Sequence, residues 1–167
     1  MHYILCIRNK HCINSNHYGP SSLSSITDSA SHWNSINTSI VLNDGVQSPV
    51  FGLGVHGIKP GKETIDAVHW ALKEGYRLID TASRYNNEES VGEAVRTSGI
   101  LREDIFVITK LYDDDHGYDE TIAAFSKSLI YLGLDYVDMY LIHAPVPDKV
   151  VPSWKAMIEL KNQGLIR

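Results

Sequence analysis

Apolar residues in this chain fall into short runs and into longer stretches of helical spacing, and the two kinds alternate from residue 39 onward. The first two runs, 39–42 and 46–50, flank an Asp-Gly turn and predict a small antiparallel hairpin. The later runs are typical of short buried strands, predicted at 51–54, 77–80, 106–110 and 136–143. The stretches of helical spacing predict helices at about 64–74, 88–97, 119–132 and 154–160.

The predicted order is strand then helix, four times over, with short links between successive elements. This order implies parallel strands joined by right-handed crossovers, as in α/β folds of the (β/α)8 TIM-barrel family. A closed barrel needs eight strands and about 250 residues, whereas the 167 residues supply only four such units. We therefore expect the first four β/α units of a barrel behind an N-terminal hairpin, with Arg167 lying where a fifth strand is due to begin.

Residues 1–38 are rich in Ser, Asn and His and show no apolar periodicity. Such a segment buries too little apolar surface to offset its chain entropy, so we expect a disordered or irregular leader before a partial barrel domain at 39–167. The only two cysteines, Cys6 and Cys12, lie there together with His2, His11 and His17. Their spacing matches no common zinc pattern, so we interpret them as a reduced pair and expect no metal.

Composition narrows the class of protein further. The formal net charge is −5, and the sequence shows no basic patch of the kind that a nucleic-acid partner would require. No apolar run approaches the roughly 20 residues that cross a bilayer, and the opening run at 2–7 is too short for a secretory signal. We expect a cytoplasmic protein without nucleic-acid or membrane partners.

Ionisable side chains mark the carboxyl ends of three predicted strands. Asp80, Lys110 and His143 close the strands, and Tyr85 lies in the link after Asp80. In a parallel α/β fold these ends share one rim. An ammonium beside a phenol favours the phenolate, a carboxylate holds the ammonium, and an imidazole can orient a carbonyl oxygen. The set could protonate an oxygen while hydride arrives at carbon from an external donor, because no side chain supplies hydride.

Each of these residues also has an ordinary structural interpretation. Asp80 could cap a turn, Lys110 could be a solvated strand end, and Tyr85 could pack in its loop. Their joint occurrence at successive strand ends favours chemistry over these alternatives. Elsewhere, we interpret the run 113–116 (Asp-Asp-Asp-His) as a solvated turn rather than a metal site, and Trp154 and Met157 as core residues.

Several motifs together resemble the aldo-keto reductase superfamily, in particular its microbial diketogluconate reductase-like branch. They are an Asp-Thr-Ala turn at 80–82, Tyr85, Asn-Glu at 87–88, Lys110 and Leu-Ile-His at 141–143. The resemblance implies that Tyr85 is the general acid, Lys110 its activating partner and Asp80 the residue that holds Lys110. It also implies that His143, with Tyr85, binds a small carbonyl substrate. NADPH is the implied cofactor, with Asp80 at its site and most of its binding residues expected beyond Arg167.

The chain departs from the family's pattern near the expected substrate mouth. It has Val55-His56 where the family often has Thr-Trp, and Tyr112 and Ala144 where Trp is frequent. The resemblance therefore does not indicate the substrate.

Three hypotheses follow from these observations. The first is NADPH-dependent reduction of aldehydes or ketones with Tyr85 as proton donor. The second is a truncated, non-catalytic half-barrel that serves as an interaction module or is inactive, and that self-associates through exposed edges. The third, a metal-dependent barrel hydrolase, has little support because no paired histidines on a strand accompany Asp80 and Lys110.

Overall fold

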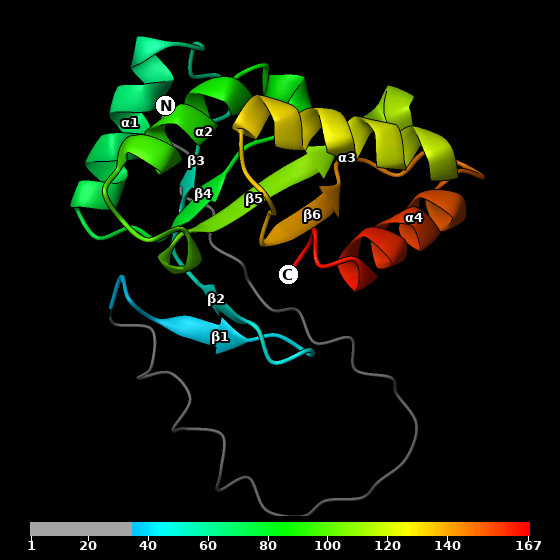
Figure 1. The fold of residues 1–167 in the computed structure, drawn as a ribbon, viewed down its shortest axis with the longest axis horizontal. Coiled ribbons are helices and arrows are strands. Elements are labelled where there is room, and N and C mark those ends of the chain that lie inside the picture. Colours follow the sequence, from blue (N-terminus) through cyan, green and yellow to red (C-terminus); the bar gives the residue numbers. More distant parts are fainter. Residues whose placement is uncertain (1–34) are drawn as a thin grey trace, which may run out of the picture.

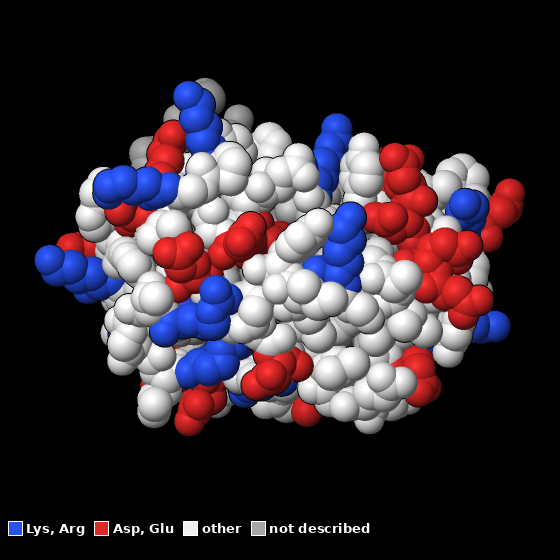
Figure 2. Space-filling view, turned by 45° about the horizontal axis from the view of Figure 1, so that its top comes forward, with Lys and Arg blue, Asp and Glu red and all other residues white. Residues whose placement is uncertain are grey.

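A computed structural model describes residues 35–167 of the chain (Figure 1). The expected leader falls almost wholly outside the described residues, as do Cys6, Cys12 and the three nearby histidines. Within 35–167, no helix is both long enough and apolar enough to cross a membrane. Acidic and basic side chains are interspersed on the face that the helices present (Figure 2).

The predicted hairpin is confirmed. β1 (Ser39–Val41) pairs antiparallel with β2 (Gln47–Pro49). In the turn, the Asp44 carboxylate accepts a hydrogen bond from the Val46 N–H at 3.1 Å, and Gly45 has a φ of 88°. The Asp-Gly pair therefore makes this turn because glycine adopts a positive φ without steric cost.

The core of the molecule is a parallel sheet with strand order β3-β4-β5-β6, flanked by four helices (Figure 1). The strands are β3 (Leu53–Gly54), β4 (Leu78–Asp80), β5 (Phe106–Leu111) and β6 (Met139–Ile142). The helices are α1 (Lys62–Lys73), α2 (Glu88–Thr97), α3 (Tyr118–Leu132) and α4 (Val150–Asn162). Short 3-10 turns are η1 (Ser83–Tyr85), η2 (Arg102–Asp104) and η3 (Asp113–Asp115).

This arrangement confirms four β/α units of the (β/α)8-barrel fold behind an N-terminal hairpin. The last strand is shorter than predicted, since β6 starts at Met139 rather than at residue 136. Val137 instead forms an isolated parallel bridge with Ile166. The segment after α4 thus lies next to the stretch that leads into β6, where the sequence predicts the start of a fifth strand.

The two-residue alternation of the strands divides the buried side chains between two faces. Ile79, Val107 and Leu111 belong to the large core beneath the helices. The neighbouring residues Leu78, Phe106 and Ile108 belong to a separate cluster, which Val46 of the hairpin also contacts. Successive side chains of a strand point to opposite faces, so β4 and β5 are buried on both sides and the hairpin covers part of the inner one.

Two glycines shape the packing of α2 against α3. One ends α3, and the other allows α2 to approach it closely. Gly133 caps α3 in the left-handed conformation, with a φ of 60°, and its N–H donates to the carbonyl of Leu129. A Cβ on Gly92 of α2 would lie 1.8 Å from the carbonyl oxygen of Leu132. The close contact between the two helices therefore requires glycine at residue 92.

One prediction for α4 is wrong. Met157 and Leu160 are buried as expected, but Trp154 is 57% exposed, as are neighbouring Val151 at 65% and Ile158 at 46%. Helical spacing alone does not show which apolar face meets the core when a helix carries two. Met157 and Leu160 belong to the large hydrophobic core, and the Trp154 side of the helix faces out.

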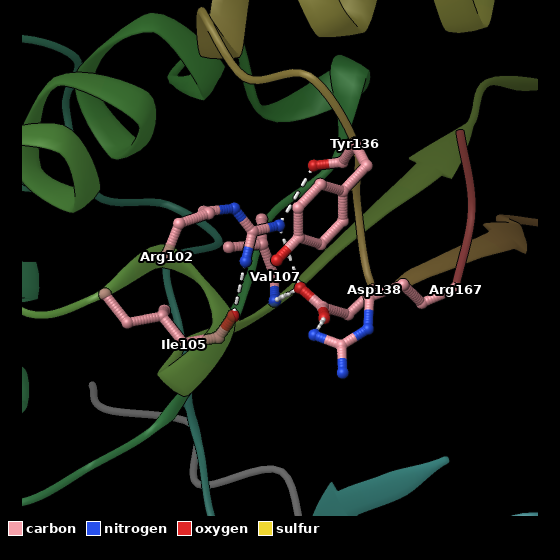
Figure 3. A network of polar contacts seen from close by, with 6 residues as sticks. All are labelled: Arg102, Ile105, Val107, Tyr136, Asp138 and Arg167. Carbon is pink, nitrogen blue, oxygen red and sulfur yellow. Dashed lines mark hydrogen bonds and ion pairs between the residues drawn. The ribbon is translucent and has the colours of Figure 1, made fainter. Parts of the chain in front are cut away.

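A buried carboxylate ties together the amino-terminal ends of β5 and β6 (Figure 3). The Asp138 side chain, 1% exposed, accepts hydrogen bonds from Arg102 at 2.9 Å, Arg167 at 3.1 Å and the Val107 N–H at 2.9 Å. Arg102 also lies over the Tyr136 ring, 4.1 Å from its centroid. Asp138 therefore joins the start of β5, the turn before it and the segment that follows α4.

Replacing Asp138 by Ala should lower the free energy of unfolding by about 3 to 5 kcal/mol, because two guanidinium groups lose a buried counter-charge. Urea unfolding of the chain measures this loss. The same change at exposed Asp135, three residues earlier, should cost no more than about 0.5 kcal/mol. Equal losses in the two variants would show that the Asp138 contacts contribute no more than a surface carboxylate does.

Candidate active site

The inner face of the sheet carries reactive side chains at the carboxyl ends of three adjacent strands. Asp80 follows Leu78 by two residues, Lys110 follows Ile108 by two, and His143 follows Leu141 by two. Each therefore points to the same face of the sheet as an apolar residue of the inner cluster. The parallel register places these three side chains, from β4, β5 and the end of β6, at one rim, as the sequence predicts.

Lys110 is at the centre of this group. Its ammonium nitrogen lies 2.5 Å from Asp80 Oδ1, 2.8 Å from the Thr81 carbonyl oxygen and 3.3 Å from the Tyr85 hydroxyl. The Lys110 and Asp80 side chains are only 13% and 8% exposed. Burial raises the pKa of the Asp80 carboxyl above its ordinary value, and the Lys110 ammonium opposes this rise. The ion pair thus links the phenol to a largely buried carboxyl group.

Tyr85 is positioned by the turn that follows β4. It ends η1, where its N–H donates to the Ala82 carbonyl at 2.9 Å. Asn86 then adopts a left-handed conformation with a φ of 55°, which reverses the chain into α2. The Tyr85 ring is half-buried and the Lys110 nitrogen lies 4.9 Å from its centroid.

His143, directly after β6, contacts Tyr85 through its ring. The two rings meet edge to face with their centroids 5.7 Å apart. Burial lowers the pKa of His143, and the Lys110 charge lowers it further, whereas Asp113 raises it. His143 is therefore a neutral imidazole at neutral pH. Its Nδ1 is buried and has no hydrogen-bond partner within residues 35–167.

Two residues beyond the four predicted site residues help to shape this group. His56, exposed in the loop after β3, meets the Tyr85 ring with centroids 4.8 Å apart. Asn87 is fully buried, and its amide donates to the carbonyls of Val55 and Ile58 while accepting from Thr81. Asn87 thereby fixes the loop of His56 against the turn of Tyr85. The Asn-Glu motif at residues 87–88 was the sequence feature that could have identified Asn87.

A cavity of about 350 Å³ lies beside this group, between η1, α2 and α3. Arg84, Tyr112, Lys127 and Tyr131 line it, with buried Glu88, which accepts a hydrogen bond from Thr109 at 2.6 Å. Asp80, Tyr85, Lys110 and His143 do not line it. The cavity is therefore distinct from the space at the Tyr85 hydroxyl.

The predicted solvated turn at 113–116 is wrong for its last residue. His116 is fully buried and lies 3.1 Å from both the Ala144 carbonyl oxygen and the Ser153 hydroxyl. The sequence misled because three consecutive acids suggest solvent, whereas the histidine after them turns inward between two loops. Among the described residues, no group of three or more His, Cys, Asp or Glu side chains is arranged to hold a metal.

Comparison with known proteins decides the family. The model of the aldo/keto reductase family matches residues 51–167. The chain belongs to the aldo/keto reductase family. It is 47% identical over 133 residues to the glyoxal reductase of Bacillus subtilis, covering 80% of this chain and 48% of that protein.

Solved aldo/keto reductases share the fold. A crystal structure of an aldo/keto reductase from Brucella melitensis matches with a TM-score of 0.75 and 48% identity, over 78% of this chain and 50% of that one. A Bombyx mori aldo-keto reductase in complex with NADP matches with a TM-score of 0.69 and 39% identity, over 78% and 48% of the two chains. The chain thus spans about half the length of the aldo/keto reductases that it matches.

The electrostatics of His143 can be tested by substitutions of opposite sign. Lys110→Met should raise the pKa of His143, because it removes a cation that disfavours the imidazolium. Asp113→Asn should lower it, because it removes an anion that favours the imidazolium. Titration of the ring by NMR gives both values. Shifts in the same direction would contradict the described arrangement around His143.

Proposed function

We propose that this aldo/keto reductase chain carries the acid–base half of a site that reduces small aldehydes or ketones to alcohols with NADPH. The observation that carries the proposal is the placement of one ammonium, Lys110, against both the Asp80 carboxylate and the Tyr85 hydroxyl. The names of its relatives, among them a glyoxal reductase, support reduction of a small carbonyl compound.

Tyr85 is the proton donor in this proposal. As hydride reaches the carbonyl carbon, negative charge grows on the oxygen, and the Tyr85 O–H transfers its proton there. The phenolate that remains is stabilised by the Lys110 ammonium 3.3 Å away. Asp80 keeps that ammonium in place, since its carboxylate lies 2.5 Å from Lys110 Nζ.

His143 orients the carbonyl in this proposal. Its neutral ring has one proton, and placing that proton on buried Nδ1 would leave an N–H donor without a partner. The proton is therefore better placed on Nε2. That N–H can donate to a carbonyl oxygen that also accepts from the adjacent Tyr85.

The described residues fit a nicotinamide cofactor beside Asp80. Oδ1 of Asp80 is taken by Lys110, whereas Oδ2 has no hydrogen bond within residues 35–167 and is not among the buried unpaired atoms. Oδ2 is thus an available acceptor for a cofactor hydroxyl group. NADPH, when bound, supplies the hydride that no side chain can provide. The NADP complex of the Bombyx mori relative supports this choice of cofactor.

Tyr85→Phe should lower kcat/KM for a reactive small dicarbonyl by at least about 100-fold, because the proton donor is lost. NADPH consumption measures the turnover, and nucleotide fluorescence should show binding that is largely unchanged. Tyr118→Phe, an equal change at a tyrosine that is 41% exposed at the start of α3, should leave both unaffected. Undiminished turnover in the Tyr85 variant would refute the proposal, and so would an unaltered chain that binds NADPH and the dicarbonyl together without turning them over.

A second candidate function is a non-catalytic module that pairs with another copy of the chain. Exposed Val151, Trp154 and Ile158 on α4 favour it, because they form an apolar stripe on the helix that follows edge strand β6. A second copy is the occupant that we propose, since the same stripe on both partners makes a self-complementary contact.

Sedimentation velocity tests this second candidate. The chain should associate as its concentration rises, and Trp154→Glu should shift the association to at least about tenfold higher concentration, the effect of 1.4 kcal/mol. Trp70→Glu on α1 is a matched control, because Trp70 is exposed to a similar extent, 66% against 57%. A monomer at all concentrations would exclude pairing.

A further inference from the structure

Buried His116 links three segments around the end of β6. It lies after η3, its Nε2 is 3.1 Å from the Ala144 carbonyl oxygen, and its Nδ1 is 3.1 Å from the hydroxyl of Ser153 on α4. His116 and Ser153 are both fully buried. The side chain thus connects the loop that follows β5 with the loop that follows β6 and with α4.

The partners determine which nitrogen of His116 carries a proton. A carbonyl oxygen only accepts, so Nε2 must donate to Ala144. In the neutral ring Nδ1 is an acceptor for the single proton of the Ser153 hydroxyl, which also lies 2.9 Å from the Lys149 carbonyl. The Ser153 oxygen itself accepts the Gly117 N–H at 3.0 Å. Each polar atom of the two side chains therefore has a partner within 3.1 Å, which favours one orientation of the His116 ring.

The acceptor of His116 directly follows His143. The His143 N–H donates to the Leu111 carbonyl of β5 at 3.1 Å, and the Ala144 carbonyl receives His116. The backbone is thus held on both sides of the His143 ring. Within the described residues, the buried Nδ1 of the His143 ring has no hydrogen-bond partner. The position of the ring therefore depends on the backbone at residues 143 and 144.

We propose that His116 is a positioning residue for His143, acting through the Ala144 carbonyl and held in place by Ser153. It sets the edge-to-face contact of His143 with Tyr85, in which the ring centroids lie 5.7 Å apart. The consequence for carbonyl reduction rests on the function proposed above. The link from His116 to His143 does not depend on that function, and it can be measured even in a chain that turns over no substrate.

The test compares His116→Leu with His116→Gln. Leucine fills the site without a donor, whereas glutamine extends an amide N–H to about where Nε2 lies. The readout is the NMR titration of the His143 ring, identified by its loss in His143→Gln. The charged groups that act on this ring are Lys110, Asp113, Arg84 and Asp80, from β5, η3, η1 and β4. All of them are unchanged in both variants.

We expect His116→Leu to raise the pKa of His143 toward its ordinary value, because the released ring loses the burial that lowers it. His116→Gln should keep the pKa of the unaltered chain. Thr121→Val is the matched control: it removes the hydrogen bond from buried Thr121, on the first turn of α3, to the Gly117 carbonyl of the same loop, without touching Ala144. It should lower the unfolding midpoint but leave the His143 pKa unchanged.

Two results would overturn the proposal. One is an unchanged His143 pKa in His116→Leu with a loss of stability like that of Thr121→Val, which would make His116 purely structural. The other is a glutamine variant that behaves like leucine. If the leucine variant does not fold, His116→Asn, whose shorter amide does not reach Ala144, takes its place with the same expectation. In an active chain, the leucine or asparagine variant should lower kcat by about 10- to 100-fold with KM little changed.

Discussion

The alternation of side chains along parallel strands is the constraint on which the candidate site depends. Leu78 and Asp80 of β4, and Ile108 and Lys110 of β5, face the same side because they are two residues apart. A shift of register by one residue would turn Lys110 toward the helices and leave Asp80 without its partner. Asp138 opposes such a shift, because its buried carboxylate binds the Val107 N–H and two arginines at the opposite end of the strands.

The Lys110–Asp80 pair is costly to bury, and its surroundings explain why it persists. Desolvation raises the pKa of the Asp80 carboxyl, and the compensation is local: Lys110 donates to the carboxylate, to the Thr81 carbonyl and toward the Tyr85 hydroxyl. A buried ion pair contributes little to stability when compared with apolar residues of the same size. Its position beside the Tyr85 hydroxyl is therefore the reason for the acid–base role proposed above.

Loops in this molecule are fixed by buried polar side chains. Asn87 joins the loop of His56 to the turn of Tyr85, and His116 joins the loop after β5 to the end of β6. A buried amide or imidazole binds specific backbone atoms at a defined distance, which an apolar side chain cannot do.

The sequence by itself determined the order of elements, the parallel sheet and the residues at its rim. Hydrophobic periodicity and turn residues are local signals, and β4, β5, α2 and α3 obey them closely. Only the tertiary structure decided the distances from Lys110 to Asp80 and to Tyr85, the outward position of Trp154 and the burial of His116. These features depend on contacts between segments that are far apart in the sequence, and local hydrophobic periodicity does not specify such contacts.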